Sequence, residues 1–147
     1  MGTDYSILTG MEQASKDISH RIFHAQVAGC RLRVKRIEPS VPGQSLQKPT
    51  LVFLHEGLGC IELWRDFPEA VCAATGCAGL VYDRKGYGGS DPYGGPWPLD
   101  YLRKESKVYL PGLLRNCDLE HAVLIGHSDG GTISLLPRRA TAAGYAG

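Results

Sequence analysis

The amino-acid sequence predicts an α/β fold in which two antiparallel strands precede a mostly parallel sheet. Three short runs, at residues 50–55, 78–82 and 121–126, are apolar at consecutive positions, which is typical of strands covered on both faces. The segments between these runs are long enough to cross back over a sheet, as parallel pairing requires. The predicted order is strand, strand, loop, strand, helix, strand, helix, strand, turn and helix.

The two leading strands are predicted at residues 23–29 and 31–37, joined around Gly29 and Cys30. Basic and apolar residues alternate in the stretch RLRVKR, so we expect the second strand to be half-buried with a solvated basic face. Residues 38–49 contain proline, glycine and serine without an apolar period, and they predict a loop.

Apolar residues at steps of three and four predict amphipathic helices over residues 61–74 and 99–116. Gly76 suits the end of the first helix, and Pro111 is expected to kink or divide the second. A third helix is predicted at residues 130–136, directly after a turn.

These elements are expected to form one domain over residues 23–136, between an arm at residues 1–22 and an irregular tail at residues 137–147. A chain of 147 residues has room for one modest domain. The tail is rich in alanine and glycine and lacks an apolar period. This change of character after Leu136 leads us to expect a partial domain with a truncated or frame-shifted end.

The composition argues against several classes of function. Apolar residues make up 43% and charged residues 21%, as in ordinary globular proteins, and the net charge of +1 gives no reason to expect nucleic-acid or membrane binding. The sequence has no apolar run of about 18 residues and no signal-peptide plan, so we expect a cytoplasmic protein. The five cysteines are odd in number and form no C-x-x-C pair, which argues against a disulfide framework and structural zinc.

The segment VLIGHSDGG places Ser128 between two glycines at G-x-S-x-G spacing, after a predicted strand and before a predicted helix. This context is typical of a nucleophile elbow, in which a strained serine stands at the tip of a sharp turn. The helix start would direct its free N–H groups at an oxyanion, and the backbone N–H of Asp129 is one candidate donor. The alternative is a small residue in an ordinary tight turn.

The segment HEGLG follows the first parallel strand and offers a place for the second oxyanion donor. Gly57 is the first candidate for this N–H, and Leu58 is the second. Taken alone, HEGLG is equally consistent with an ordinary turn between a strand and a helix.

Three segments, LVFLHEGLGCIELWRDFP, YDRKGYGGSD and VLIGHSDGG, resemble the α/β-hydrolase superfamily and occur in the expected order. The resemblance covers roughly residues 23–136 and is strongest to small bacterial-type members with a D-R-x-G-x-G-x-S segment. It implies a serine nucleophile at Ser128 and an oxyanion hole formed by Gly57 and Asp129. It also implies turn or pocket roles for His55, Glu56, Leu58 and His127. A serine at the elbow argues against dehalogenases and epoxide hydrolases, the relatives that use aspartate there.

The superfamily places its catalytic residues in the order serine, acid, histidine. After Ser128 the sequence contains no histidine, and its only acid is Asp129. His55 is expected to organise the oxyanion turn rather than act as the base. The sequence therefore predicts an α/β-hydrolase core that is incomplete at its C-terminus. It would belong to a serine hydrolase of esters, amides or C–C bonds that lacks the triad acid and histidine and is inactive as this chain alone.

Two alternatives remain at this stage: a non-catalytic ligand-binding protein or pseudoenzyme fragment, and one half of a two-chain hydrolase. The expected partner is a small-molecule substrate if the protein is active, with possible self-association through an exposed sheet edge. No cofactor or metal is expected, because the sequence lacks a P-loop, a dinucleotide fingerprint and an H-E-x-x-H motif.

Overall fold

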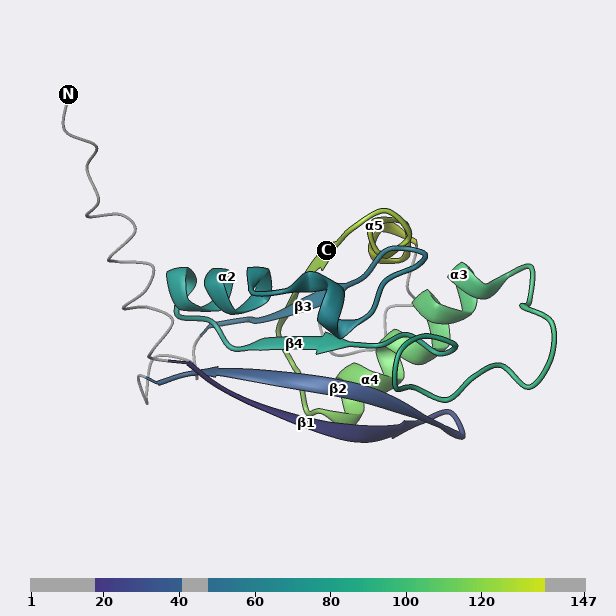
Figure 1. Ribbon diagram of the computed structural model, residues 1–147, viewed down its shortest axis with the longest axis horizontal. Helices are drawn as coiled ribbons and strands as arrows, with labels where there is room; N and C mark the ends of the chain where they lie inside the picture. Colours follow the sequence, from purple (N-terminus) through teal and green to yellow (C-terminus); the bar gives the residue numbers. More distant parts are fainter. Residues whose placement is uncertain (1–17, 41–47, 137–147) are drawn as a thin grey trace, which may run out of the picture.

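The computed structural model describes residues 18–40 and 48–136, and these form one five-stranded sheet with helices on both faces (Figure 1). The order across the sheet is β1-β2-β4-β3-β5. The strands are β1 (Ile18–Val27), β2 (Cys30–Pro39), β3 (Thr50–Leu54), β4 (Gly79–Tyr82) and β5 (Ala122–Gly126). β3 runs parallel to β4 and β5, whereas β2 is antiparallel to β1 and β4. The predicted α/β fold class is confirmed. The expected tail and most of the expected arm lie outside the described residues.

β1 and β2 form a hairpin that is longer than predicted. Its two turn residues, Ala28 and Gly29, both have positive φ angles of 49° and 77°, the geometry that suits a tight turn between twisted strands. β1 begins at Ile18 rather than at Phe23, because backbone pairing with the end of β2 continues to Pro39. The side chains in this extension are mostly exposed, so their apolar pattern gives no sign of a strand.

Side chains of the parallel strands alternate between two separate hydrophobic clusters. On β3, Val52 and Leu54 pack with residues of helix α4 (Leu110–Asn116) such as Leu113. Leu51 and Phe53 face the opposite side, where they pack around helix α2 (Phe67–Thr75). Both faces of the sheet are therefore covered, which explains why these strands are apolar at consecutive positions.

The first predicted helix is broken into two. A short 3-10 turn, η2 (Ile61–Trp64), is followed by α2 (Phe67–Thr75). Between them Arg65 has φ 53° and ψ −126°, which a helix cannot contain. The prediction of one helix over residues 61–74 was wrong because its apolar stripe continues across this break. Gly76 ends α2 in the left-handed conformation, as predicted.

The second predicted helix is one rod that contains a π-helical turn. It consists of α3 (Tyr101–Lys104), the π turn η3 (Glu105–Tyr109) and α4 (Leu110–Asn116). Pro111 lies inside this rod, directly after the π turn, and it cannot donate the N–H that would continue the helical ladder. The irregularity expected at Pro111 therefore takes the form of a wider turn just before it. After β5, helix α5 (Asp129–Leu135) follows the turn that contains Ser128.

The basic residues of β2 have partners within the fold. Arg33 pairs with Glu62 and with Asp83, and Lys35 pairs with Glu69. The basic face of β2, which we expected to be solvated, therefore forms ion pairs with the segments that contain these three acidic residues.

The described cysteines are free thiols, and Cys72 is fully buried against the sheet. Burial raises the pKa of its thiol to about 12, so it is an inert core residue. Within the described ranges we find no helix with the length and apolar content needed to cross a bilayer.

Glu105 provides a test of this buried structure. Its side chain is 2% exposed and accepts a hydrogen bond from the Tyr82 hydroxyl at 2.9 Å. Burial raises its pKa to about 7, so its contribution to stability is complete below pH 4.5 and is lost as the pH rises through 7.

We compare the unfolding free energy of Glu105→Gln with that of wild type at two pH values. The difference should be about 2–3 kcal/mol more favourable to the variant at pH 8 than at pH 4.5. Urea titrations at both pH values measure this difference, with the exposed Glu120→Gln as the control. An equal effect of Glu105→Gln at both pH values would contradict the prediction.

Candidate active site

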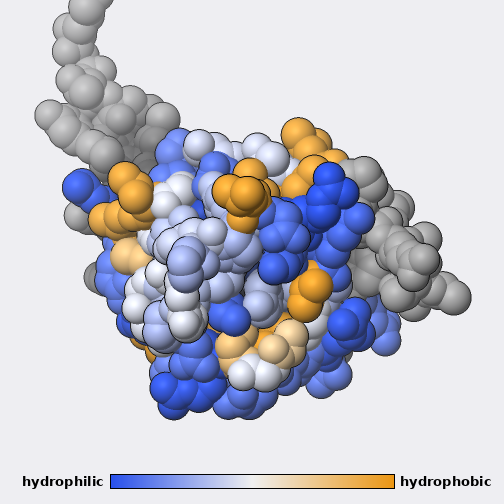
Figure 2. Space-filling model, turned by 90° about the vertical axis from the view of Figure 1, so that its right-hand side faces the viewer, coloured by the Kyte–Doolittle hydropathy of each residue, from blue (hydrophilic) through white to orange (hydrophobic). Residues whose placement is uncertain are grey.

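The carboxyl ends of β3, β4 and β5 lie at one end of the sheet, since the three strands are parallel. The turns that follow them, at residues 55–60, 83–100 and 127–128, therefore meet at this end. Figure 2 shows the molecule from this side, with separate hydrophobic spots set in hydrophilic surface. In open parallel sheets, ligands bind at this end.

Ser128 occupies a strained position between β5 and α5. Its φ of 52° and ψ of −113° lie outside the regions that a serine prefers, and its side chain is exposed. Strain of this kind persists only where the surrounding structure enforces it, and it is common at functional sites. The sequence predicted such a turn at this place.

Two glycines permit the close packing around the strained turn. A Cβ atom on Gly126 would lie 2.4 Å from the backbone of Gly130, and one on Gly130 would lie 2.0 Å from the carbonyl oxygen of Leu54. The start of α5 thus packs directly against β3 and β5. Only residues without a side chain permit this approach.

Gly57 lies against Asp129, the residue after Ser128. A Cβ on Gly57 would stand 3.0 Å from Oδ2 of Asp129. Neither of their backbone N–H groups has a hydrogen-bond partner among residues 18–40 and 48–136. The structure thus brings together the two residues that were predicted to supply the oxyanion N–H groups. Leu58, the second candidate, is 89% exposed on the same turn.

His55 is buried and uses both ring nitrogens to hold the turn. Its Nδ1 lies 2.7 Å from the carbonyl oxygen of Glu56, and its Nε2 accepts the backbone N–H of Arg84 at 3.0 Å. Burial lowers its pKa, which favours the neutral ring with the proton on Nδ1. No ring nitrogen of His55 is left to accept a proton from Ser128.

Glu56 and His127 connect the oxyanion turn to the elbow at the surface. Nδ1 of His127 lies 3.4 Å from Oε2 of Glu56. The pKa of Glu56 is lowered, mainly by a hydrogen bond from the backbone N–H of the same residue. Partial burial raises this pKa, and the contact with His127 lowers it further. The His127 side chain is 69% exposed, so this contact is screened by solvent.

Asp83 ties together the loops around the site. Its carboxylate is fully buried and accepts the N–H groups of Ile61 and Gly89 at 2.7 and 2.8 Å. Cys60, Glu62 and Asp83 place potential metal ligands within 4.8 Å of one another. Arg33 already pairs with both carboxylates, so a guanidinium supplies the positive charge there.

Sequence reasoning also missed a group of aromatic residues after β4. The rings of Tyr87, Tyr93 and Tyr101 each contact the ring of Trp97, with centroids 4.8–5.6 Å apart. The Tyr101 hydroxyl donates to Oδ2 of Asp129 at 2.8 Å. The density of aromatic residues over 87–101 was the one signal in the sequence, and it does not show which way they face.

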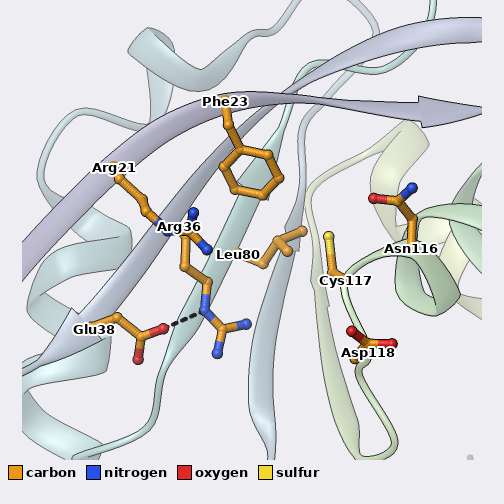
Figure 3. Close-up of a pocket in the computed structure, with 8 residues that line it drawn as sticks. All are labelled: Arg21, Phe23, Arg36, Glu38, Leu80, Asn116, Cys117 and Asp118. Atoms are coloured by element: carbon orange, nitrogen blue, oxygen red, sulfur yellow. Dashed lines mark hydrogen bonds and ion pairs between the residues drawn. The ribbon is translucent and has the colours of Figure 1, made fainter.

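A pocket of about 270 Å³ lies at the other end of the sheet (Figure 3). Asp118, one of its lining residues, comes before β5, whereas Ser128 comes after it. Two arginines and two acids line the pocket, and Arg36 is already bonded to Glu38 at 2.6 Å. Its charges therefore balance, and it has no connection to the Ser128 site.

Comparison with known families gives one match, to the alpha/beta hydrolase fold, over residues 49–136 and thus more than half of the chain. No curated protein matches the sequence.

Several solved structures share the fold. Epoxide hydrolase A from Mycobacterium thermoresistibile has 24% identity and a TM-score of 0.62, with 79% of this chain and 34% of that chain covered. A predicted CIB-like hydrolase from Thermoplasma acidophilum has 15% identity and a TM-score of 0.62, with coverages of 80% and 55%. The haloalkane dehalogenase DatA from Agrobacterium tumefaciens C58 has 18% identity and a TM-score of 0.61, with coverages of 84% and 37%. The chain spans between about a third and about half of the length of these proteins.

Proposed function

The chain belongs to the alpha/beta hydrolase fold family, and we propose that it is the nucleophile-bearing part of a serine hydrolase. The observation that carries this proposal is the strained Ser128, followed by Asp129, whose carboxylate lies against Gly57. The backbone N–H groups of Gly57 and Asp129 have no partner among the described residues. Because serine stands where dehalogenases and epoxide hydrolases of the superfamily use aspartate, we propose cleavage of an ester, amide or C–C bond.

In the proposed reaction, Oγ of Ser128 attacks a carbonyl carbon of the substrate while a base removes the hydroxyl proton. The carbonyl oxygen becomes an oxyanion, which accepts hydrogen bonds from the N–H groups of Gly57 and Asp129. The leaving group departs with a proton, and water then releases the acyl group from Ser128. Because both proposed donors are backbone N–H groups of turns that pack against the sheet, they would require little reorganisation during the reaction.

We propose that the base and the acid of the triad come from outside these 147 residues, from further sequence or from a second chain. The sequence has no histidine after Ser128, and both ring nitrogens of His55 are engaged. The greater length of the fold neighbours is consistent with this proposal. The 147-residue chain alone should then be almost inactive.

A fluorophosphonate probe with added imidazole tests the nucleophile. Imidazole can replace a missing histidine in part, because it supplies a base that diffuses into the exposed site. We expect peptide mass spectrometry to find the phosphonyl adduct on Ser128 in wild type and no adduct in Ser128→Ala. An adduct on another serine, or none on a folded chain, would contradict the proposal.

A partner is also proposed for the free edge of β5. Within the described ranges this strand pairs only with β3, and Val123 on it is 46% exposed. An unpaired apolar edge favours pairing with another strand, either a completing segment or a second copy of the chain.

We therefore expect the wild-type chain to associate with increasing concentration and Val123→Lys to remain monomeric. Analytical ultracentrifugation measures this difference. Val108→Lys is the control, since Val108 is 43% exposed but lies on the π-helical turn. Equal association of the wild type and Val123→Lys would exclude the β5 edge.

A further inference from the structure

Arg84 places a buried cation behind the candidate site. The residue is 1% exposed, and its guanidinium carbon lies 4.6 Å from the centre of the Tyr87 ring. Its Nε has no hydrogen-bond partner among the residues that the structure describes. Burying a guanidinium with an unsatisfied N–H is costly, so its remaining contacts must compensate for the loss of solvent.

One of these contacts is to the peptide that carries an oxyanion donor. Nη2 of Arg84 donates to the carbonyl oxygen of Glu56 at 2.9 Å, and Nδ1 of His55 lies 2.7 Å from the same oxygen. This carbonyl and the N–H of Gly57 belong to one planar trans peptide, so they point in opposite directions. Holding the oxygen therefore fixes the direction of the Gly57 N–H.

The other contact is an ion pair with the carboxylate of Asp129. Nη2 of Arg84 lies 3.8 Å from Oδ2 of Asp129, and this carboxylate sits against Gly57. A negative charge beside the oxyanion would oppose the charge that develops in the reaction. The Arg84 cation offsets it, and the Tyr101 hydroxyl holds the carboxylate in place.

We propose that Arg84 is a positioning residue for the oxyanion hole. It keeps the Gly57 N–H directed away from its own side chain and into the site, and it neutralises the carboxylate of Asp129. The inference rests on the proposed function, because an oxyanion forms only if Ser128 is a nucleophile.

The test measures the rate of imidazole-supported phosphonylation of Ser128 in four variants of the 147-residue chain. We expect Arg84→Met to lower the rate about tenfold or more, and Arg103→Met, on the exposed face of α3, to leave it unchanged. Arg84→Lys keeps the charge and should recover part of the rate. In Arg84→Met/Asp129→Asn the uncompensated carboxylate is gone, so the rate should rise about tenfold above that of Arg84→Met.

A purely structural role for Arg84 predicts no such recovery, because Asp129→Asn restores none of its contacts. A double variant no faster than Arg84→Met would therefore overturn the charge part of the inference.

Backbone ¹⁵N relaxation tests the other part without any reaction. We expect the Gly57 order parameter to fall from about 0.85 towards about 0.6 in Arg84→Met and to stay high in Arg103→Met. An unchanged value in Arg84→Met would overturn the positioning role. If wild type forms no adduct but Gly57 loosens as expected, the proposed function fails while the structural effect of Arg84 stands.

Discussion

Gly130→Ala should lower the unfolding free energy by about 3 kcal/mol or more. The new Cβ would lie 2.0 Å from the carbonyl oxygen of Leu54, an atom of the β3 backbone. β3 is the central parallel strand and pairs with both β4 and β5, so its backbone has no freedom to move aside. Helix α5 would have to lift away from the sheet, and the strained turn at Ser128 would relax.

Gly131→Ala is the matched control on the same helix. Its Cβ would meet nothing closer than the carbonyl oxygen of Gly126 at 3.6 Å, which is an ordinary contact. Alanine in a helix is favoured over glycine by about 0.5–1 kcal/mol, so this variant should be as stable as wild type or more stable. Chemical denaturation followed by circular dichroism compares the two. Similar stabilities for both variants would show that α5 does not pack on β3 as described.

Asp83→Ala is expected to cost about 3–5 kcal/mol of unfolding free energy. The buried carboxylate accepts the N–H groups of Ile61 and Gly89 and faces Nη1 of Arg33 at 3.4 Å. Removing it leaves two backbone donors without an acceptor and a partly buried guanidinium with one partner fewer. The loop after β4 and the start of η2 would lose their common attachment.

The matched control for this variant is Asp91→Ala, in the same loop. Asp91 accepts the N–H of Arg31 at 2.8 Å, but it lies at the surface, where water replaces the lost contact. We expect its urea midpoint to stay close to that of wild type. A midpoint for Asp83→Ala that matches the one for Asp91→Ala would refute the role of Asp83 as a buried tie.

The parallel strands were predictable because both faces of the sheet are covered, so that residues 50–54 are all buried and residues 51–54 are all apolar. The break at Arg65 was not, because a positive φ at a residue other than glycine depends on the packing around it. The π turn at residues 105–109 was equally hidden, since two of the side chains that it buries, Glu105 and Ser106, are polar and give no apolar signal. Local patterns thus predict which segments pack on the sheet but not where their backbone departs from regularity.

The candidate site likewise has residues that the sequence predicts and a residue that it does not. Ser128 and Gly57 belong to short motifs, so the sequence indicates both positions and the turns that hold them. Arg84, by contrast, acts through Glu56 and Asp129, which are 28 and 45 residues away in the chain. Only the sheet order, with β4 beside β3 and β3 beside β5, brings these three residues together.

We propose that Ser128 is a nucleophile whose base is absent from these 147 residues. The most direct test measures the rate of Ser128 phosphonylation at several imidazole concentrations and pH values. The rate should rise linearly with the concentration of neutral imidazole, from a very low value in its absence, and Ser128→Ala should show no adduct under any condition. The pH dependence should follow the fraction of added imidazole that is unprotonated, with a midpoint at about pH 7. A rate that is already high without imidazole and does not respond to it would contradict this account, because a base within the 147 residues would then be activating Ser128.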